Sequence, residues 1–161
     1  MREAKLSRAR PFLVTSLERM QAAGLALNWV RKAAPPRTPE PEVWAAMARL
    51  LDQLDDAEDS VSPRARLAAA GLQLLSAFGW GIDFERCVSC GKTPAGAQAA
   101  AVDAARGGLV CRDCGGARRR LSASERLLLQ RAASGGTLSD ESAALALELV
   151  EQALKTHGGI E

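Results

Sequence analysis

Four cysteines in two close pairs constrain the fold of this chain more than any other feature of its sequence. The pairs are Cys87-Val-Ser-Cys90 and Cys111-Arg-Asp-Cys114, and 20 residues separate them. Two intervening residues let both sulfurs of a pair reach one tetrahedral ion, and this spacing is typical of a two-knuckle zinc site. Gly91 and Gly115 follow the pairs and allow a tight turn, since glycine accepts positive φ. We therefore expect Cys87, Cys90, Cys111 and Cys114 to bind one Zn²⁺.

The segment that carries these cysteines is poor in large apolar side chains. Residues 80–121 consist mostly of Gly, Cys, Ala and Arg, so an ordinary core is not expected there. Four thiolates complete the coordination of Zn²⁺ and leave no place for water, which predicts a structural site. Its contribution to folding would be on the order of 10 kcal/mol. A redox dithiol, two disulfides and an iron–sulfur cluster are the alternatives, although no βαβ pattern surrounds either pair.

The remainder of the chain predicts helices, because Ala and Leu dominate and β-branched residues are few. A first helix is expected over residues 12–33. Pro41 and Pro63 can each open a helix, and Ser122 and Ser139 are expected to cap two more. Ser122 has capping-box spacing to a glutamate. The apolar stripe of the first helix comprises Leu13, Leu17, Met20, Gly24 and Leu27.

These patterns predict a mainly α fold, a helical bundle with an inserted four-cysteine zinc module. Residues 1–83 would form the first part of the helical region, residues 84–118 the zinc-binding module, and residues 119–161 the second helical part of one compact domain. No strand is expected outside the cysteine segment. Three tryptophans on or beside the apolar stripes are expected in the core: Trp29, Trp44 and Trp80.

Few residue types that support catalysis are present. His157 is the only histidine, and it lies where the last helix is expected to end. No Ser/His/Asp or Cys/His pairing is evident, so we do not expect an enzyme or a small-molecule substrate. No secretory signal follows the basic amino terminus, and no apolar stretch has the length of a membrane helix, so no membrane partner is expected.

The charges are unevenly distributed along the chain. Residues 1–37 hold eight Lys/Arg and two acids, whereas residues 38–62 hold one base and seven acids. Residues 106–131 hold seven Arg and two acids. Arginine suits phosphate because its planar fork donates two hydrogen bonds at once, so DNA contact is one hypothesis. Solvated faces that pair with each other, or compensation of the charged thiolates, are the alternatives. The candidate DNA-binding residues are Arg112, Arg118, Arg119 and Arg120.

Two segments of the chain resemble a known family. Residues 74–91 end a helix in the step Phe-Gly-Trp-Gly and continue through Asp83-Phe-Glu-Arg to the first knuckle, and Gly107-Gly precedes the second. These segments resemble the carboxy-terminal region of the bacterial recombination and repair protein RecO. The resemblance extends more weakly to Arg2-Glu-Ala-Lys5 and to Leu154-Lys-Thr-His-Gly158.

The resemblance implies a recombination mediator that binds DNA, helps to anneal strands and assists RecA loading, with RecR and the single-stranded-DNA-binding protein as partners. It also implies a cytoplasmic, nucleoid-associated protein of bacteria. Family members carry an amino-terminal OB-fold, which the residues before the first helix do not encode, and a short final segment after the position of Glu161. A zinc-stapled protein-interaction module without nucleic-acid binding is the alternative function.

Overall fold

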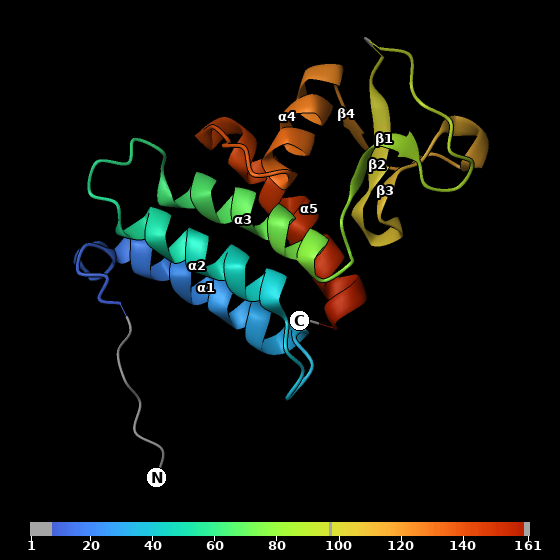
Figure 1. Cartoon of the computed structure of the whole chain (residues 1–161). Helices are drawn as coiled ribbons and strands as arrows, with labels where there is room; N and C mark the ends of the chain where they lie inside the picture. The colour runs from blue at the N-terminus through green and yellow to red at the C-terminus, as the bar shows by residue number, and fades with distance from the viewer. Residues whose placement is uncertain (1–7, 97, 160–161) are drawn as a thin grey trace.

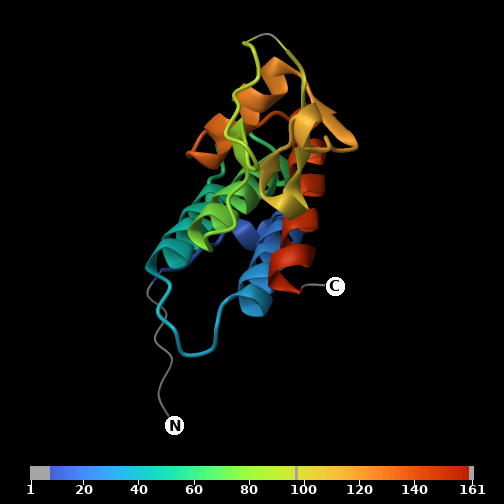
Figure 2. The same cartoon turned by 90° about the vertical axis from the view of Figure 1, so that its right-hand side faces the viewer.

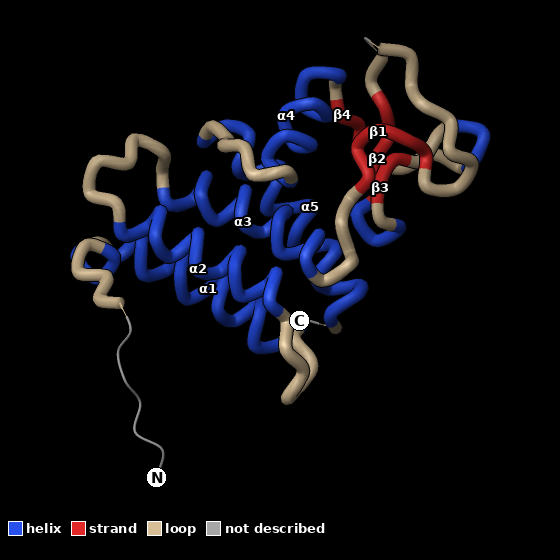
Figure 3. The backbone as a smooth tube through the Cα atoms, viewed as in Figure 1, coloured by secondary structure: helices blue, strands red, loops and turns tan. Residues whose placement is uncertain are grey.

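A computed structural model describes residues 8–96 and 98–159, so two segments of the family resemblance, Arg2-Glu-Ala-Lys5 and the end at Glu161, lie outside the described residues. Five α-helices account for most of the fold, and a small sheet lies at one end of them (Figures 1 and 3). The helices are α1 (Leu17–Ala33), α2 (Pro41–Asp55), α3 (Pro63–Ala77), α4 (Ala123–Ala133) and α5 (Asp140–Gly158). The strands are β1 (Asp83–Cys87), β2 (Ala100–Asp103), β3 (Gly108–Leu109) and β4 (Arg119–Leu121). The short 3₁₀ helices are η1 (Leu13–Thr15), η2 (Ala104–Arg106) and η3 (Arg112–Cys114).

Helix starts follow the capping residues that the sequence indicated. The Ser62 side chain accepts a hydrogen bond from the amide of Ala65, and Pro63 occupies the first turn of α3. Ser122 and Glu125 form both hydrogen bonds of a capping box at the start of α4. The predictions of helix starts at Pro41, Pro63, Ser122 and Ser139 are therefore confirmed.

Helix α3 lies at the centre of the helical region and contacts all four other helices. Helices α1 and α2 cover one side of it, and α4 and α5 cover the other (Figures 1 and 2). Close packing is possible because α3 is rich in small residues. A Cβ at Gly71 would lie 2.9 Å from Cγ1 of Val150, so only glycine allows α5 to approach this closely.

The sheet lies against α4 and α5 and has the strand order β1-β3-β2-β4. Strands β1 and β3 are parallel, whereas β2 is antiparallel to both β3 and β4. The few apolar side chains of this segment do not form a separate core, which agrees with the expectation, and most of them join the core of the helices. These buried residues are Phe84, Val102, Leu109, Val110 and Leu121. The mainly α prediction is confirmed, but a pure helical bundle is not what forms, since this four-stranded sheet is part of the fold.

Two predictions about the core are wrong. Trp44 is 77% exposed, because α2 buries the face of Val43 and Met47 and Trp44 projects about 100° away from it. Helix α1 buries Ala22, Ala23, Ala26 and Trp29, whereas most of the stripe expected there faces solvent. Trp29 is buried as predicted, and Trp80 is packed against the core.

Acidic residues at the end of α2 hold the segment that precedes α1. Arg8 and Arg10 both pair with Asp52, at 2.8 and 2.9 Å. The backbone amides of Phe12 and Leu13 donate to Oδ1 of Asp55, at 2.9 and 3.0 Å. Basic residues of the first charged segment therefore pair with an acidic residue of the second, as the alternative of mutually pairing faces predicts.

Within the described part of the chain, no helix combines the length and the apolar character that crossing a membrane requires.

Asp59 provides a test of how the α2–α3 connection is held. Its carboxylate accepts two hydrogen bonds from Arg66, at 2.7 and 2.9 Å, and one from the amide of Val61. The hydrogen bond from Arg66 is the main reason that the pKa of Asp59 lies below its ordinary value. We expect Asp59→Asn to lower the free energy of unfolding at pH 7 by about 2 kcal/mol.

The free energy of unfolding lost in Asp59→Asn should become smaller as the pH falls. Because the folded-state pKa is lowered, the stabilisation is present above the ordinary carboxyl pKa and disappears as the pH falls through the folded-state value. Urea titrations from pH 7 into the acid range should therefore show the free energies of unfolding of the unchanged protein and of Asp59→Asn becoming equal. Asp56→Asn, in the same loop but exposed, is the matched control, and an equal loss in that variant would contradict the assignment.

Candidate metal centre

Two turns at the same edge of the sheet carry the four cysteines. Cys87 is the last residue of β1, and Cys90 lies in the turn that follows it. Cys111 comes two residues after β3, and Cys114 ends η3. Cys87 pairs with Leu109 of β3, and the amide of Val88 donates to the Leu109 carbonyl at 2.9 Å. The parallel pairing of β1 and β3 therefore brings the two turns together.

The sulfur atoms are arranged as ligands of one ion would be. All four Sγ atoms lie within 4.8 Å of one another, and none of them forms a disulfide. The Sγ atoms of Cys90 and Cys111 are 3.7 Å apart. A tetrahedral ion with metal–sulfur bonds of about 2.3 Å requires sulfur separations of about 3.8 Å. The four residues could hold a metal ion, and their geometry and chemistry fit one bound by four thiolates.

Both turns have the form expected of zinc knuckles. The amide of Gly91 donates to the Cys87 carbonyl at 2.8 Å, and the amide of Gly116 donates to the Cys111 carbonyl at 2.9 Å. Gly91 has φ of 73° and Gly115 has φ of 100°, which is left-handed backbone that favours glycine. The predicted role of these two glycines is confirmed.

Backbone amides favour a thiolate at Cys87. The amide of Cys111 donates to Sγ of Cys87 at 3.4 Å, and this bond, together with amides of its own turn, lowers the pKa of Cys87 to about 6. Cys114 behaves oppositely, because the side chains of Cys111 and Cys90 raise its pKa to about 12. Negative charge is thus already favoured on one sulfur, while another keeps its proton until a cation neutralises the cluster.

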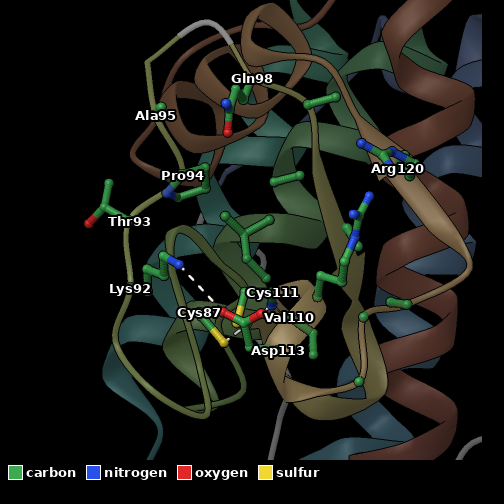
Figure 4. Close-up of a pocket in the computed structure, with 18 residues that line it drawn as sticks. Cys87, Lys92, Thr93, Pro94, Ala95, Gln98, Val110, Cys111, Asp113 and Arg120 are labelled. Carbon is green, nitrogen blue, oxygen red and sulfur yellow. Dashed lines mark hydrogen bonds and ion pairs between the residues drawn. The ribbon is translucent and has the colours of Figure 1, made fainter.

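An ion pair joins the two turns beside the sulfurs. Nζ of Lys92 lies 3.4 Å from Oδ2 of Asp113, and Figure 4 shows these side chains facing one another near Cys87 and Cys111. Both are largely exposed, so the pair contributes little to stability. Cys87 is buried, whereas Cys90 is exposed. The cluster is therefore accessible from one side.

A pocket of about 810 Å³ extends from the cysteines across the sheet. The loop containing Thr93 and Ala95 forms one wall, and Arg120 of β4 lies on the opposite side (Figure 4). Arg112 also lines this pocket. Neither Arg112 nor Arg120 has an acidic partner within 4 Å among residues 8–96 and 98–159, so two guanidinium groups near the cluster are available to an anion.

The arginine run does not form one basic surface. Arg119 pairs with Glu148 of α5 at 3.2 Å, on the side of β4 that faces the helices. Arg120 follows it in the strand and lines the pocket instead. Arg118 is exposed just before β4. Of the four predicted DNA-binding residues, the structure brings only Arg112 and Arg120 to the same pocket.

Sequence reasoning missed Arg126, the one buried charged residue in the described part of the chain. Its Nη2 donates to the carbonyls of Gly96 and Gln98, at 3.4 and 3.0 Å. Through these bonds α4 holds the long loop between the first knuckle and β2. An arginine in the first turns of an amphipathic helix gives no signal of this role, because its partners are backbone carbonyls about 30 residues away in sequence.

Comparison with known families finds one match. Residues 14–161 match the family described as "Recombination protein O C terminal". The match covers all five helices, the sheet and the four cysteines. No curated protein matches the chain.

Substitution of one sulfur tests the metal centre. We expect Cys111→Ser to reduce the bound metal from one ion per chain to near zero, because Cys111 contacts both cysteines of the first turn, Cys87 and Cys90. Residues 84–118 should lose hydrogen-exchange protection while the helices keep theirs. Elemental analysis of protein purified under reducing conditions measures the first effect, and exchange mass spectrometry measures the second.

The control is Ser89→Ala, which changes a residue between the two cysteines of the first knuckle without removing a sulfur. This variant should keep its metal. Unchanged metal content in Cys111→Ser would refute the assignment of that residue as a ligand.

The thiol pKa values predict how metal affinity depends on pH. Cys114 holds a proton at neutral pH in the metal-free protein, so binding must release it, and affinity should rise at least about tenfold per pH unit. Below about pH 6 Cys87 is also protonated, so the dependence there should steepen by about one further proton. Competition with a chromogenic chelator at several pH values measures both slopes. An affinity independent of pH would contradict binding through these thiolates.

Proposed function

Because residues 14–161 place this chain in the family of the recombination protein O carboxy-terminal region, we propose that it acts in DNA recombination and repair. The family match is the observation that carries this proposal. The role is that of a non-catalytic mediator, which binds DNA or other recombination proteins and does not transform a substrate. Its place of action would be the bacterial cytoplasm, at the nucleoid.

The metal is proposed to be Zn²⁺, bound by Cys87, Cys90, Cys111 and Cys114. Four thiolates without carboxylate or imidazole ligands favour zinc over harder cations, and a site with four protein ligands has no open position for substrate. When bound, the ion supplies structural stabilisation. Binding of a partner would be done by the chain's own residues, since the knuckles position Arg112 and the sheet positions Arg120.

DNA contact is proposed at the pocket shared by Arg112 and Arg120. Both guanidinium groups lack an acidic partner among the described residues, and the pocket opens beside a loop that carries Lys92. Phosphate is the natural ligand of such a pair, because guanidinium groups bind phosphate oxygens in a two-pronged geometry. Arg118 would add charge at the rim, whereas Arg119 is occupied by Glu148.

The protein partners are proposed on the family alone. RecR and the single-stranded-DNA-binding protein are the expected partners of a protein of this kind, and no particular residues are assigned to them here.

A zinc-stapled interaction module without nucleic-acid binding is the second candidate. The observation that favours it is the pairing of Arg119 with Glu148 and of Lys92 with Asp113, which reduces the free positive charge of the module. Salt distinguishes the two functions. Phosphate contacts predict that affinity for DNA falls steeply with salt concentration, whereas an interaction module should not bind DNA even at low salt.

Paired substitutions test the DNA site. We expect Arg112→Ala with Arg120→Ala to weaken binding to DNA of any sequence about equally, and to reduce the slope of log affinity against log salt by about 2. Fluorescence anisotropy with labelled oligonucleotides of unrelated sequence measures both effects.

Two control variants accompany this experiment. Arg119→Ala should have a smaller effect, because that side chain is already paired, and Arg64→Ala removes an exposed charge at the start of α3, far from the sheet. If the double variant bound DNA as tightly as the unchanged protein while both retained the metal, the arginines would have a structural role and the pocket would not be the DNA site.

A further inference from the structure

One buried charge in this fold has no counter-ion. Arg126 of α4 is only 9% exposed. Its Nη2 donates to the carbonyls of Gly96 and Gln98, but its Nε is buried and has no hydrogen-bond acceptor. No Asp or Glu lies within 4 Å of this guanidinium group in residues 8–96 and 98–159. A buried guanidinium ion without a counter-ion is costly, so this arrangement indicates a place for an anion that comes from another molecule.

Arg126 lines a second pocket, of about 740 Å³, which we name the α4 pocket. Thr93 and Pro94 line both this pocket and the one beside the cysteines, so a single loop separates the two. The walls of the α4 pocket include the apolar side chains of Phe84, Pro94 and Leu127. An apolar environment strengthens the attraction between a charge and its counter-ion.

Other parts of the lining also favour an anion. Ala123 and Ser124, the first two residues of α4, belong to it. The first amides of a helix lack acceptors within the helix and lie at the positive end of its dipole. Arg86 lines the pocket as well, and its side chain is 63% exposed. Glu85 is the one acid in the lining, and its carboxylate accepts a hydrogen bond from Gln130. Two guanidinium groups therefore face one carboxylate that is already bound.

We propose that the α4 pocket binds a phosphate group through Arg126, and that this group belongs to single-stranded DNA that also contacts Arg112 and Arg120. The assignment to DNA rests on the proposed function, whereas the phosphate site does not. Phosphate combines negative charge with several acceptor oxygens, which suits a guanidinium group.

The arrangement of the two pockets favours one continuous strand. Both are lined by the loop of residues 93–96, which Figure 4 shows from the side of the cysteines, so a strand that crosses this loop can place phosphates in each pocket. The strand must bend inward to reach a side chain as buried as Arg126. Duplex DNA is too stiff for such a local bend, so the site should select a single strand.

Nuclear magnetic resonance of the arginine Nε–H groups tests the phosphate site directly. Inorganic phosphate is titrated into the whole metal-loaded chain, and the signal of Arg126 is assigned by its absence from the spectrum of Arg126→Lys. This signal should shift saturably, with a dissociation constant on the order of 1 mM, because one phosphate makes few contacts. Chloride at equal ionic strength should leave the signal in place. A signal that phosphate does not move would overturn the proposal.

Ser124→Glu blocks the pocket while leaving both bonds of Arg126 in place. Ser124 is exposed in the first turn of α4, where the helix dipole favours an acid, so the variant should fold. The added carboxylate should lower the affinity for phosphate about tenfold. Ser134→Glu is the matched control, because it makes the same change at the other end of α4, outside the pocket lining. An equal loss in both variants would show that net charge determines binding and would refute the site.

A short single-stranded oligothymidylate tests the source of the phosphate. It should move the Arg126 signal, and Ser124→Glu should reduce the slope of log affinity against log salt by about 1. A duplex of the same length that moved the signal equally would contradict the selection of a single strand. Acetate that moved it as strongly as phosphate would contradict the assignment to phosphate and indicate a carboxylate ligand.

The variant Arg112→Ala with Arg120→Ala separates this proposal from the proposed function. Inorganic phosphate should still move the Arg126 signal in that variant, whereas the oligothymidylate should bind more weakly. If phosphate moved the signal of the unchanged protein and the oligothymidylate did not, the α4 pocket would stand as a phosphate site and DNA would be excluded as its ligand.

Discussion

The meeting of four sulfurs from two turns is the constraint on which the small sheet depends. Its strands contain two to five residues, and β3 contributes only Gly108 and Leu109. So short a strand cannot hold two neighbours through its backbone bonds alone. The apolar residues of the sheet anchor its inner face to the helices, but the two knuckles lie beyond that contact. A metal bound by all four cysteines would close the open edge, and it would fix the register of β1 against β3.

The cysteine turns are linked to the helices by polar contacts rather than by a second core. Arg126 holds the loop after the first knuckle, Arg119 joins β4 to α5 through Glu148, and Gln152 of α5 donates to Asp103 at 3.3 Å. A change at the sulfur cluster would therefore alter the position of the loop and of β4 before it altered the helices. Since Arg112 lies in η3 between two of the cysteines and Arg120 lies in β4, the separation of their side chains would depend on a metal bound by the cysteines even though neither arginine would bind it.

The sequence was sufficient to predict features that depend on local chemistry. Capping serines, prolines in first turns and the Cys-x-x-Cys spacing act within a few residues, so the starts of α2 to α5 and the grouping of the four cysteines could be inferred from the chain alone. Arg126 and the pairing of β1 with β3 could not, because each depends on residues more than 20 positions away. The outward position of Trp44 also follows from tertiary packing, since α2 had another apolar face available with Val43 and Met47.

Helix α1 shows why apolar periodicity identified a helix but not its buried side. Hydrophobicity favours the stripe that contains Leu17 and Leu27, yet α3 carries small residues on most of its circumference from Ala68 to Gly71, which lets neighbouring helices approach closely. The alanines of α1 allow such an approach, and Trp29 fills the space left beside Gly71, where it would contact an added Cβ at 3.2 Å. Packing of small residues against small residues thus directs the leucines outward. The exposure of Leu17, Met20 and Leu27 on α1 is therefore a consequence of how the interior closes.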